Sequence, residues 1–135
     1  MYLIISTDKN NCFSVARADK NNLSQITVNK PFKQTELLLK TILKLVEFKK
    51  IKGIIVNQGP GEFSALRIGI ATTNALAFAL DVPVVGVSIK PELELSEKEK
   101  INFLWHKGFS AISRLSKRKI ILPYYDKEPN ITVKK

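Results

Sequence analysis

The residues best placed to bind a ligand lie in one glycine-rich stretch, 57–69, which reads NQGPGEFSALRIG. Backbone N–H groups at such a turn before a helix can bind a phosphate. The stretch lacks the Gly-Lys-Ser/Thr of a P-loop and the third glycine of a dinucleotide fingerprint. The carboxylate of Glu62 in the turn would also repel a phosphate. We therefore expect a tight turn whose Glu62 complements the helix dipole, with no nucleotide or other cofactor.

Catalytic side chains are sparse in the rest of the sequence. His106 has no cysteine or acidic partner close by, and no serine stands in a Gly-x-Ser-x-Gly setting. Two-metal hydrolysis needs clustered acids, and Asp8 is the lone candidate near the first strand. The single cysteine, Cys12, offers neither a disulfide nor a thiolate metal site and fits a reducing compartment. The sequence therefore predicts no catalytic, cofactor or metal residues, and a protein that is not an enzyme on its own.

Small residues follow the turn at a four-residue spacing and form a ridge on the expected helix: Ala65, Gly69, Thr73 and Ala77. Glycine inside a helix costs about 1 kcal/mol against alanine, so Gly69 predicts close packing at this point. The partner of the ridge is either the sheet of the same domain or a helix from another chain. A second row, Ala71, Ala75 and Ala79, lies on another side, where Arg67 suits either an interface ion pair or a solvated charge.

The elements that carry these residues can be predicted from periodicity. Runs of β-branched and aromatic residues separated by Asp- and Asn-rich turns predict three strands in a meander, at 2–6, 12–17 and 24–28. Helices and buried strands then alternate, at 33–50, 53–56, 63–80, 83–87 and from Ser96 through Trp105. The first helix carries more apolar residues than one contact with a sheet needs. The order β-β-β-α-β-α-β-α predicts an α/β, ribonuclease H-like domain with a mixed five-stranded sheet, the half-unit of actin and sugar kinases.

Charge and hydropathy constrain partners and location. The 135 residues carry a formal net charge of +10, which favours nucleic acid or an acidic partner. Lysine is spread almost evenly, and the one dense basic cluster, Lys117-Arg118-Lys119, holds the candidate RNA contacts. The stretch 68–88 contains polar residues and a proline that a membrane span would not normally hold. With no signal-peptide pattern after Met1, we expect a cytoplasmic protein without membrane contact.

The segment GPGEFSALRIGIATTNALAFALDVPVVGVS resembles the motif of the bacterial TsaB (YeaZ) family, which is close to GPGSFTGLRIG followed by a GVS strand. Other stretches look like family motifs: LIISTD, CFSVA, KQTELL and LPYY. Ser6, Gln34 and Ala65 depart from the usual residues. Members have a second domain, so the resemblance implies a C-terminally shortened form, with a ribonuclease H-like core at 1–89. We expect a reduced helix and tail at 90–135 to complete or replace the second domain.

The resemblance implies a non-catalytic scaffold subunit in the synthesis of threonylcarbamoyladenosine at position 37 of tRNA. Family members pair through their first two helices with the catalytic subunit TsaD, form homodimers through a similar surface and work with an ATPase, TsaE. An alternative function is a tRNA-binding accessory module that uses the basic C-terminal segment. A metalloprotease-type hydrolase lacks a ligand set. The residues implied at the partner interface are Gln34, Leu37, Leu38, Ala65, Leu66, Arg67, Gly69, Ile70, Thr73 and Asn74.

Overall fold

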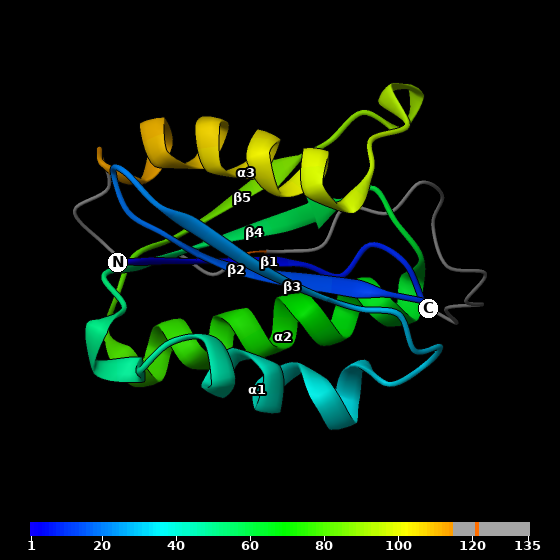
Figure 1. Cartoon of the computed structure of the whole chain (residues 1–135), viewed down its shortest axis with the longest axis horizontal. Helices are drawn as coiled ribbons and strands as arrows, with labels where there is room; N and C mark the ends of the chain where they lie inside the picture. Colours follow the sequence, from blue (N-terminus) through cyan, green and yellow to red (C-terminus); the bar gives the residue numbers. More distant parts are fainter. Residues whose placement is uncertain (115–120, 122–135) are drawn as a thin grey trace, which may run out of the picture.

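A computed structural model describes residues 1–114 and residue 121. They form one five-stranded sheet with helices on both faces (Figure 1). The strands are β1 (Tyr2–Ser6), β2 (Phe13–Ala18), β3 (Leu23–Val28), β4 (Gly53–Gly59) and β5 (Val84–Ser88). The helices are α1 (Gln34–Leu45), α2 (Phe63–Leu80) and α3 (Glu97–Ile112), with short 3-10 turns η1 (Phe48–Lys50) and η2 (Pro91–Leu93).

The sheet is mixed, as predicted, and its strands follow the order β3-β2-β1-β4-β5. β1 pairs antiparallel with β2 and parallel with β4, while β3 and β5 form the two edges. The antiparallel meander allows short turns, whereas each parallel pair needs a crossover helix. The carboxyl ends of β1, β4 and β5 therefore meet at one end of the sheet, where the glycine-rich turn also lies.

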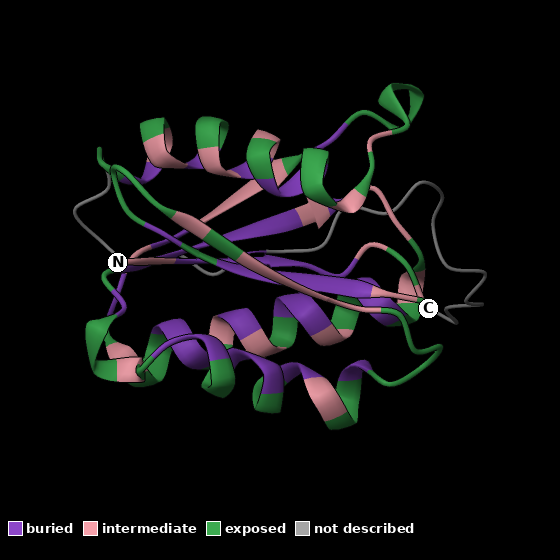
Figure 2. Cartoon of the chain, viewed as in Figure 1, coloured by how far each residue is buried: buried purple, intermediate pink, exposed green. Residues whose placement is uncertain are grey.

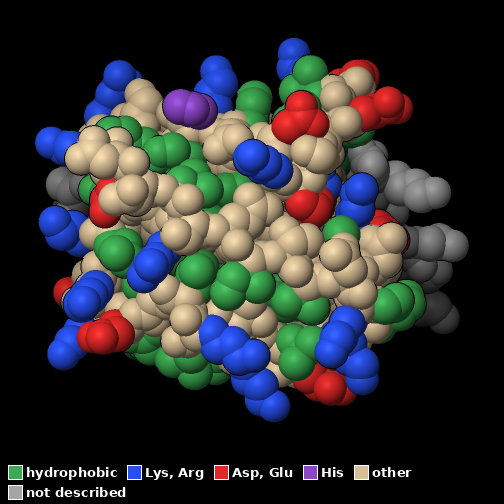
Figure 3. All heavy atoms as spheres, in the orientation of Figure 1, with side chains coloured by type: hydrophobic (Ala, Val, Ile, Leu, Met, Phe, Trp, Pro, Cys, Tyr) green, Lys and Arg blue, Asp and Glu red, His purple; other side chains and the backbone are tan. Residues whose placement is uncertain are grey.

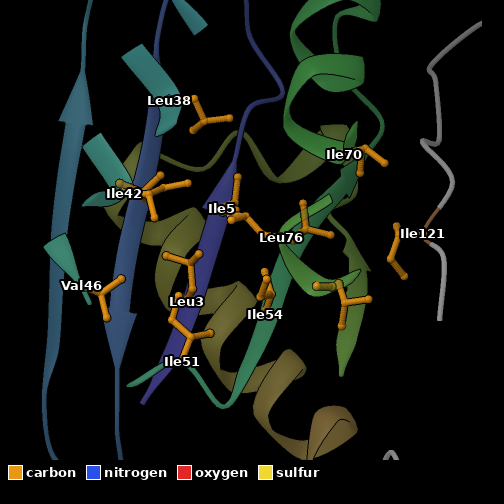
Figure 4. Close-up of a cluster of buried hydrophobic side chains, with 14 of the residues drawn as sticks. Leu3, Ile5, Leu38, Ile42, Val46, Ile51, Ile54, Ile70, Leu76 and Ile121 are labelled. Atoms are coloured by element: carbon orange, nitrogen blue, oxygen red, sulfur yellow. The ribbon is translucent and has the colours of Figure 1, made fainter. Parts of the chain in front are cut away.

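Two apolar cores lie on the two faces of the sheet because successive strand residues point to opposite sides. Leu3 and Ile5 of β1 point toward α1 and α2, and Ile4 points toward α3. The sheet-facing sides of the helices are buried and their outer sides exposed (Figure 2). Figure 4 shows the first core, with Leu38 and Ile42 of α1 close to the strands.

Three boundaries show how local chemistry sets the elements. α2 has the bounds that its periodicity predicted, and Asp81 ends it in the left-handed conformation. α1 ends at Leu45, earlier than predicted, because Val46 is extended and η1 follows. α3 begins with the predicted capping box: Ser96 Oγ accepts from the Glu99 N–H at 3.2 Å, and Glu99 Oε1 accepts from the Ser96 N–H at 2.9 Å.

Candidate functional site

The glycine-rich turn before α2 is bound to the loop between β1 and β2. The Glu62 N–H donates to the Asp8 carbonyl at 2.9 Å. The Glu62 carboxylate accepts from the backbone N–H of Asn10 at 3.0 Å and from its Nδ2 at 3.1 Å. Asn10 Oδ1 in turn accepts from the Ala65 N–H at 3.1 Å. A Cβ on Gly61 would lie 2.7 Å from Asp8 Cβ, so the turn packs directly on the loop. The backbone N–H groups of Glu62 and Ala65, which could otherwise bind a phosphate, therefore already donate to acceptors of this chain.

The ridge of small residues on α2 packs against the sheet of the same chain. Ala65, Gly69, Thr73 and Ala77 are all buried. A Cβ on Gly69 would clash with Oγ1 of Thr7 and lie 2.9 Å from its Cβ and Cγ2. The spacing left two possible partners for the ridge, the sheet of this chain or a helix of another chain. The ridge packs against the sheet of this chain, at the residue that directly follows β1. The second row, Ala71, Ala75 and Ala79, is exposed.

Most residues predicted at a partner interface contribute to the core of this chain. Arg67 is exposed, with its guanidinium 5.1 Å from the centre of the Phe63 ring, and Leu37 and Asn74 are half-buried. Gln34 Nε2 donates to the Lys9 carbonyl at 2.7 Å and so ties the start of α1 to the β1–β2 loop. Only three of the ten therefore offer surface to another chain. The seven buried ones are Gln34, Leu38, Ala65, Leu66, Gly69, Ile70 and Thr73.

The outer sides of α1 and α2 carry exposed apolar side chains. Leu39, Leu43 and Phe78 are 44%, 56% and 72% exposed, and are three of the five large apolar side chains most exposed in the described part of the chain. We call Leu39, Leu43, Ala71, Ala75 and Phe78 the helix face. Exposed large apolar side chains on a helix surface are candidates for contact with another protein.

α2 is also, among the described helices, the one long and apolar enough to cross a membrane by length and composition. In this fold its ridge lies against the sheet and its other sides face α1 and the surface. Seven residues of α2 are buried against the rest of the chain, and the row Ala71, Ala75 and Ala79 is exposed.

Asn74 binds Ile121, a residue distant from it in the sequence. Its Nδ2 donates to the Ile121 carbonyl at 2.8 Å, and its Oδ1 accepts from the Ile121 N–H at 2.9 Å. Ile121 is buried and its side chain lies beside β5, where a Cβ on Gly86 would be 3.1 Å from Ile121 Cγ2. The side chain of Asn74, predicted at a partner interface, therefore binds residue 121 of its own chain.

A buried ion-pair network at the carboxyl end of β1 is a feature that sequence reasoning missed. Lys100 is 5% exposed and its Nζ lies 3.0 Å from both Asp8 Oδ1 and Glu97 Oε2. Burial alone would lower the pKa of Lys100, but the charges and hydrogen bonds of the two carboxylates outweigh it and raise the pKa. The other oxygen of Glu97 accepts from Ser14 Oγ at 2.8 Å. The network ties α3 to β1 and β2.

The charges of this network act on two residues that were considered for metal binding, Asp8 and Cys12. Asp8, the lone candidate for a metal-binding carboxylate, is paired with Lys100. Burial, followed by the negative charge of Glu97, raises the pKa of the Cys12 thiol above its ordinary value. In the described part of the chain, no three His, Cys, Asp or Glu side chains are grouped to hold a metal ion. The spacing of Glu97, Lys100, Ile101 and Leu104 on one side of α3 was the available signal.

The basic cluster is the remaining site predicted from the sequence. Lys117, Arg118 and Lys119, the candidate RNA contacts, lie outside the described residues.

Comparisons with known proteins give matches of two kinds. A family model described as TsaD, tRNA N6-adenosine threonylcarbamoyltransferase, matches residues 33–90. The tRNA N6-adenosine threonylcarbamoyltransferase of Geotalea daltonii is 55% identical over 38 residues, which are 28% of this chain and 11% of that protein. The uncharacterized protein ML0378 of Mycobacterium leprae is 30% identical over 88 residues, 62% of this chain and 23% of that protein. The matches thus span less than a quarter of these relatives.

A solved structure of YeaZ from Pseudomonas aeruginosa superposes on this chain with a TM-score of 0.61 and 29% sequence identity. The match covers 64% of this chain and 43% of that one. The predicted resemblance to the TsaB (YeaZ) family and the predicted ribonuclease H-like, actin-like fold are therefore confirmed.

Proposed function

We propose that the chain is a non-catalytic subunit that binds and activates a TsaD-type catalytic subunit in the threonylcarbamoyladenosine modification of tRNA. The likeness to YeaZ and the match to the TsaD family model support a place in this modification. The observation that carries the scaffold role is the helix face, since it presents apolar surface on the two helices through which the family resemblance implies pairing.

The ends of the strands support a role without catalysis. Catalysis at this end of the sheet would use free backbone donors at the helix start or free carboxylates beside β1. At the start of α2 the side chains of Asn10 and Glu62 accept hydrogen bonds from backbone N–H groups. Beside the end of β1, Lys100 forms an ion pair with Asp8. Both contacts bind groups to the protein itself that would otherwise be available to a substrate.

The helix face is chemically suited to a helix of another protein. Ala71 and Ala75 are exposed and small, so the backbone of a partner can approach α2 closely, and Leu39 and Leu43 supply apolar area on α1. We further propose a homodimer through the same face when the catalytic subunit is absent, a TsaE-type ATPase as a third component, and a cytoplasmic location.

We also propose that the segment from residue 90 through α3 completes the core formed by residues 1–89. α3 supports this division because Ile101 and Leu104 cover the second face of the sheet, where they pack near Ile4 and Ile55. Without α3 that face would expose fully buried isoleucines to water.

The experiment is co-expression of the full chain with the tagged TsaD-type subunit of the same organism. Ala75→Arg places a bulky charge on the helix face, and Ser110→Arg makes the same kind of change on the exposed side of α3. We expect Ala75→Arg to reduce co-purification at least about tenfold, corresponding to 1.4 kcal/mol, and Ser110→Arg to leave it unchanged. Equal recovery of a correctly folded Ala75→Arg chain would show that the helix face is not the interface.

A further inference from the structure

A second surface feature lies at the opposite end of the sheet from the glycine-rich turn. The amino end of β1 lies near the last turn of α3 (Figure 1). A cavity of about 440 Å³ opens between them. Tyr2, Lys20, Lys52 and Phe109 are among its lining residues. Its volume falls within the range of about 300–1,000 Å³ typical of small-ligand sites.

Aromatic rings form one wall of this cavity. The rings of Tyr2 and Phe109 meet edge to face at 5.7 Å between centres, and Trp105 stacks obliquely on Phe109 at 4.8 Å. All three side chains are half-buried, so the cluster is held by the core and still reaches the surface. A Cβ on Gly53 would lie 2.6 Å from Ile112 Cδ1 and 3.1 Å from the Tyr2 ring, so glycine lets both side chains pack over the start of β4. We call the rings of Tyr2, Trp105 and Phe109 the aromatic platform.

Positive charge surrounds the platform. Lys20 and Lys52 are exposed at the cavity, and an adjoining cavity of about 350 Å³, which shares Met1, Asp19 and Asn22, also contains Arg17. Lys and Arg side chains are frequent around this end of the molecule (Figure 3). These cations beside half-buried rings that reach the surface match the chemistry of a nucleotide, whose base stacks and whose phosphate is anionic.

One acidic residue, Asp19, also lines both cavities, and its carboxylate accepts hydrogen bonds from the turn that follows it. Its Oδ1 accepts from the backbone N–H groups of Asn21 at 3.0 Å and Asn22 at 2.9 Å. These bonds lower the pKa of Asp19, so its negative charge persists while it stabilises the turn. The remaining charged groups at the two cavities, the α-ammonium of Met1 and the side chains of Arg17, Lys20 and Lys52, are positive.

We propose that this cavity binds one nucleotide of a single-stranded RNA segment, with the base on the Tyr2–Phe109 platform and the phosphate near Lys20 and Lys52. The choice of RNA over a free nucleotide rests on the proposed function in tRNA modification. The cavity shares no lining residue with the helix face, so RNA and a protein partner would bind different surfaces of the chain.

Trp105 provides a direct readout, because it is the single tryptophan of the chain and contacts the platform. The full chain is titrated with a single-stranded RNA 12-mer, with transcribed tRNA, and separately with AMP and UMP. We expect both RNAs to change Trp105 emission at micromolar concentration and the mononucleotides to leave it unchanged. A response to mononucleotides without a response to RNA would overturn the assignment to RNA.

Three variants locate the binding. Lys52→Ala and Lys20→Ala change exposed side chains, and each should lower the slope of log affinity against log salt by about 0.7. Phe109→Leu keeps an apolar side chain in place and should weaken binding at least about fivefold, the lower end of one stacked base. The control is Lys90→Ala, which removes the same charge after the carboxyl end of β5.

The outcomes separate this inference from the proposed function. Weaker binding by the two lysine variants with unchanged binding by Lys90→Ala supports the site, even if Phe109→Leu fails to fold. If Lys90→Ala loses as much RNA affinity as the two lysine variants, the attraction is diffuse and the proposed site is wrong. The absence of RNA binding at low salt would also overturn the proposal. Co-purification of Lys52→Ala with the catalytic subunit is measured in parallel. If that association persists while RNA does not bind, the inference alone fails.

Discussion

Asn10 and Glu62, which lie 52 residues apart, join the β1–β2 loop to the start of α2 through two hydrogen bonds, of 3.0 and 3.1 Å. Asn10 also accepts a hydrogen bond from the Ala65 N–H and so acts as a helix cap supplied by another element. This relationship explains why the glycine-rich turn looks like an anion site. Its N–H groups point toward an acceptor, and the chain supplies that acceptor itself.

Replacing Asn10 by alanine should lower the free energy of unfolding by about 1–2 kcal/mol. The change removes a helix cap and the hydrogen bond from Nδ2 to an ionised carboxylate. Urea denaturation followed by circular dichroism measures the loss. The matched control is Asn11→Ala at the neighbouring exposed position, which should stay within about 0.5 kcal/mol of the wild type. Equal effects of the two changes would mean that Asn10 does not cap α2.

Gly69→Ala should destabilise the chain by about 1–3 kcal/mol, because its methyl group would overlap buried Thr7. Thr7→Ala removes Oγ1 and Cγ2 and should relieve part of the strain in the double variant. A double-mutant cycle by urea denaturation should give a coupling of at least about 0.5 kcal/mol in the rescuing direction. Additive losses would place the cost of Gly69→Ala elsewhere than at Thr7. Ala71→Ser, on the exposed row, is the control and should be nearly neutral.

The order of elements could be predicted because each leaves a local pattern. Runs of β-branched and aromatic residues between Asp/Asn turns marked the meander, and the apolar segment between Phe63 and Leu80 marked α2. The direction of the small-residue ridge could not be predicted, since a spacing of four residues is the same whether a sheet or a foreign helix covers it. Only the position of Thr7 against Gly69 decides between the two.

Contacts between distant segments left almost no local signal. The pair of Asn74 with Ile121 and the pair of Asp8 with Lys100 each join segments that no periodicity relates. Lys100 did share the apolar stripe of α3 with Ile101 and Leu104, which is unusual for a lysine. A charged residue on a buried stripe predicts a buried partner, although the sequence does not identify which one.

Asn74→Ala should expose the amide of Ile121 to exchange with solvent. In the wild type this N–H donates to Asn74 Oδ1 and the residue is buried, so its exchange is protected. Hydrogen exchange read by NMR or mass spectrometry should show at least tenfold faster exchange of the segment containing residue 121, as loss of about 1.4 kcal/mol of protection requires. Asn102→Ala on exposed α3 is the control, and unchanged protection in Asn74→Ala would contradict the pairing.

Lys100→Met should lower the free energy of unfolding by about 3 kcal/mol near neutral pH, because it leaves Asp8 and Glu97 without their cation. Lys98→Met, at an exposed position of the same helix, is the control and should cost under about 0.5 kcal/mol. Adding Asp8→Asn and Glu97→Gln to Lys100→Met should recover part of the loss, since no unpaired charge then remains.

The same lysine predicts a pH dependence with a defined sign. Its pKa is raised in the folded chain, so the ammonium stabilises the fold fully below the ordinary lysine pKa of about 10.4. That contribution is lost as the pH rises from there through the folded pKa. The difference in unfolding free energy between wild type and Lys100→Met should therefore be constant from pH 7 to about 9.5 and shrink above about 10.4. Urea denaturation across this range measures it, and a difference that grows with alkaline pH would contradict the ion pairs.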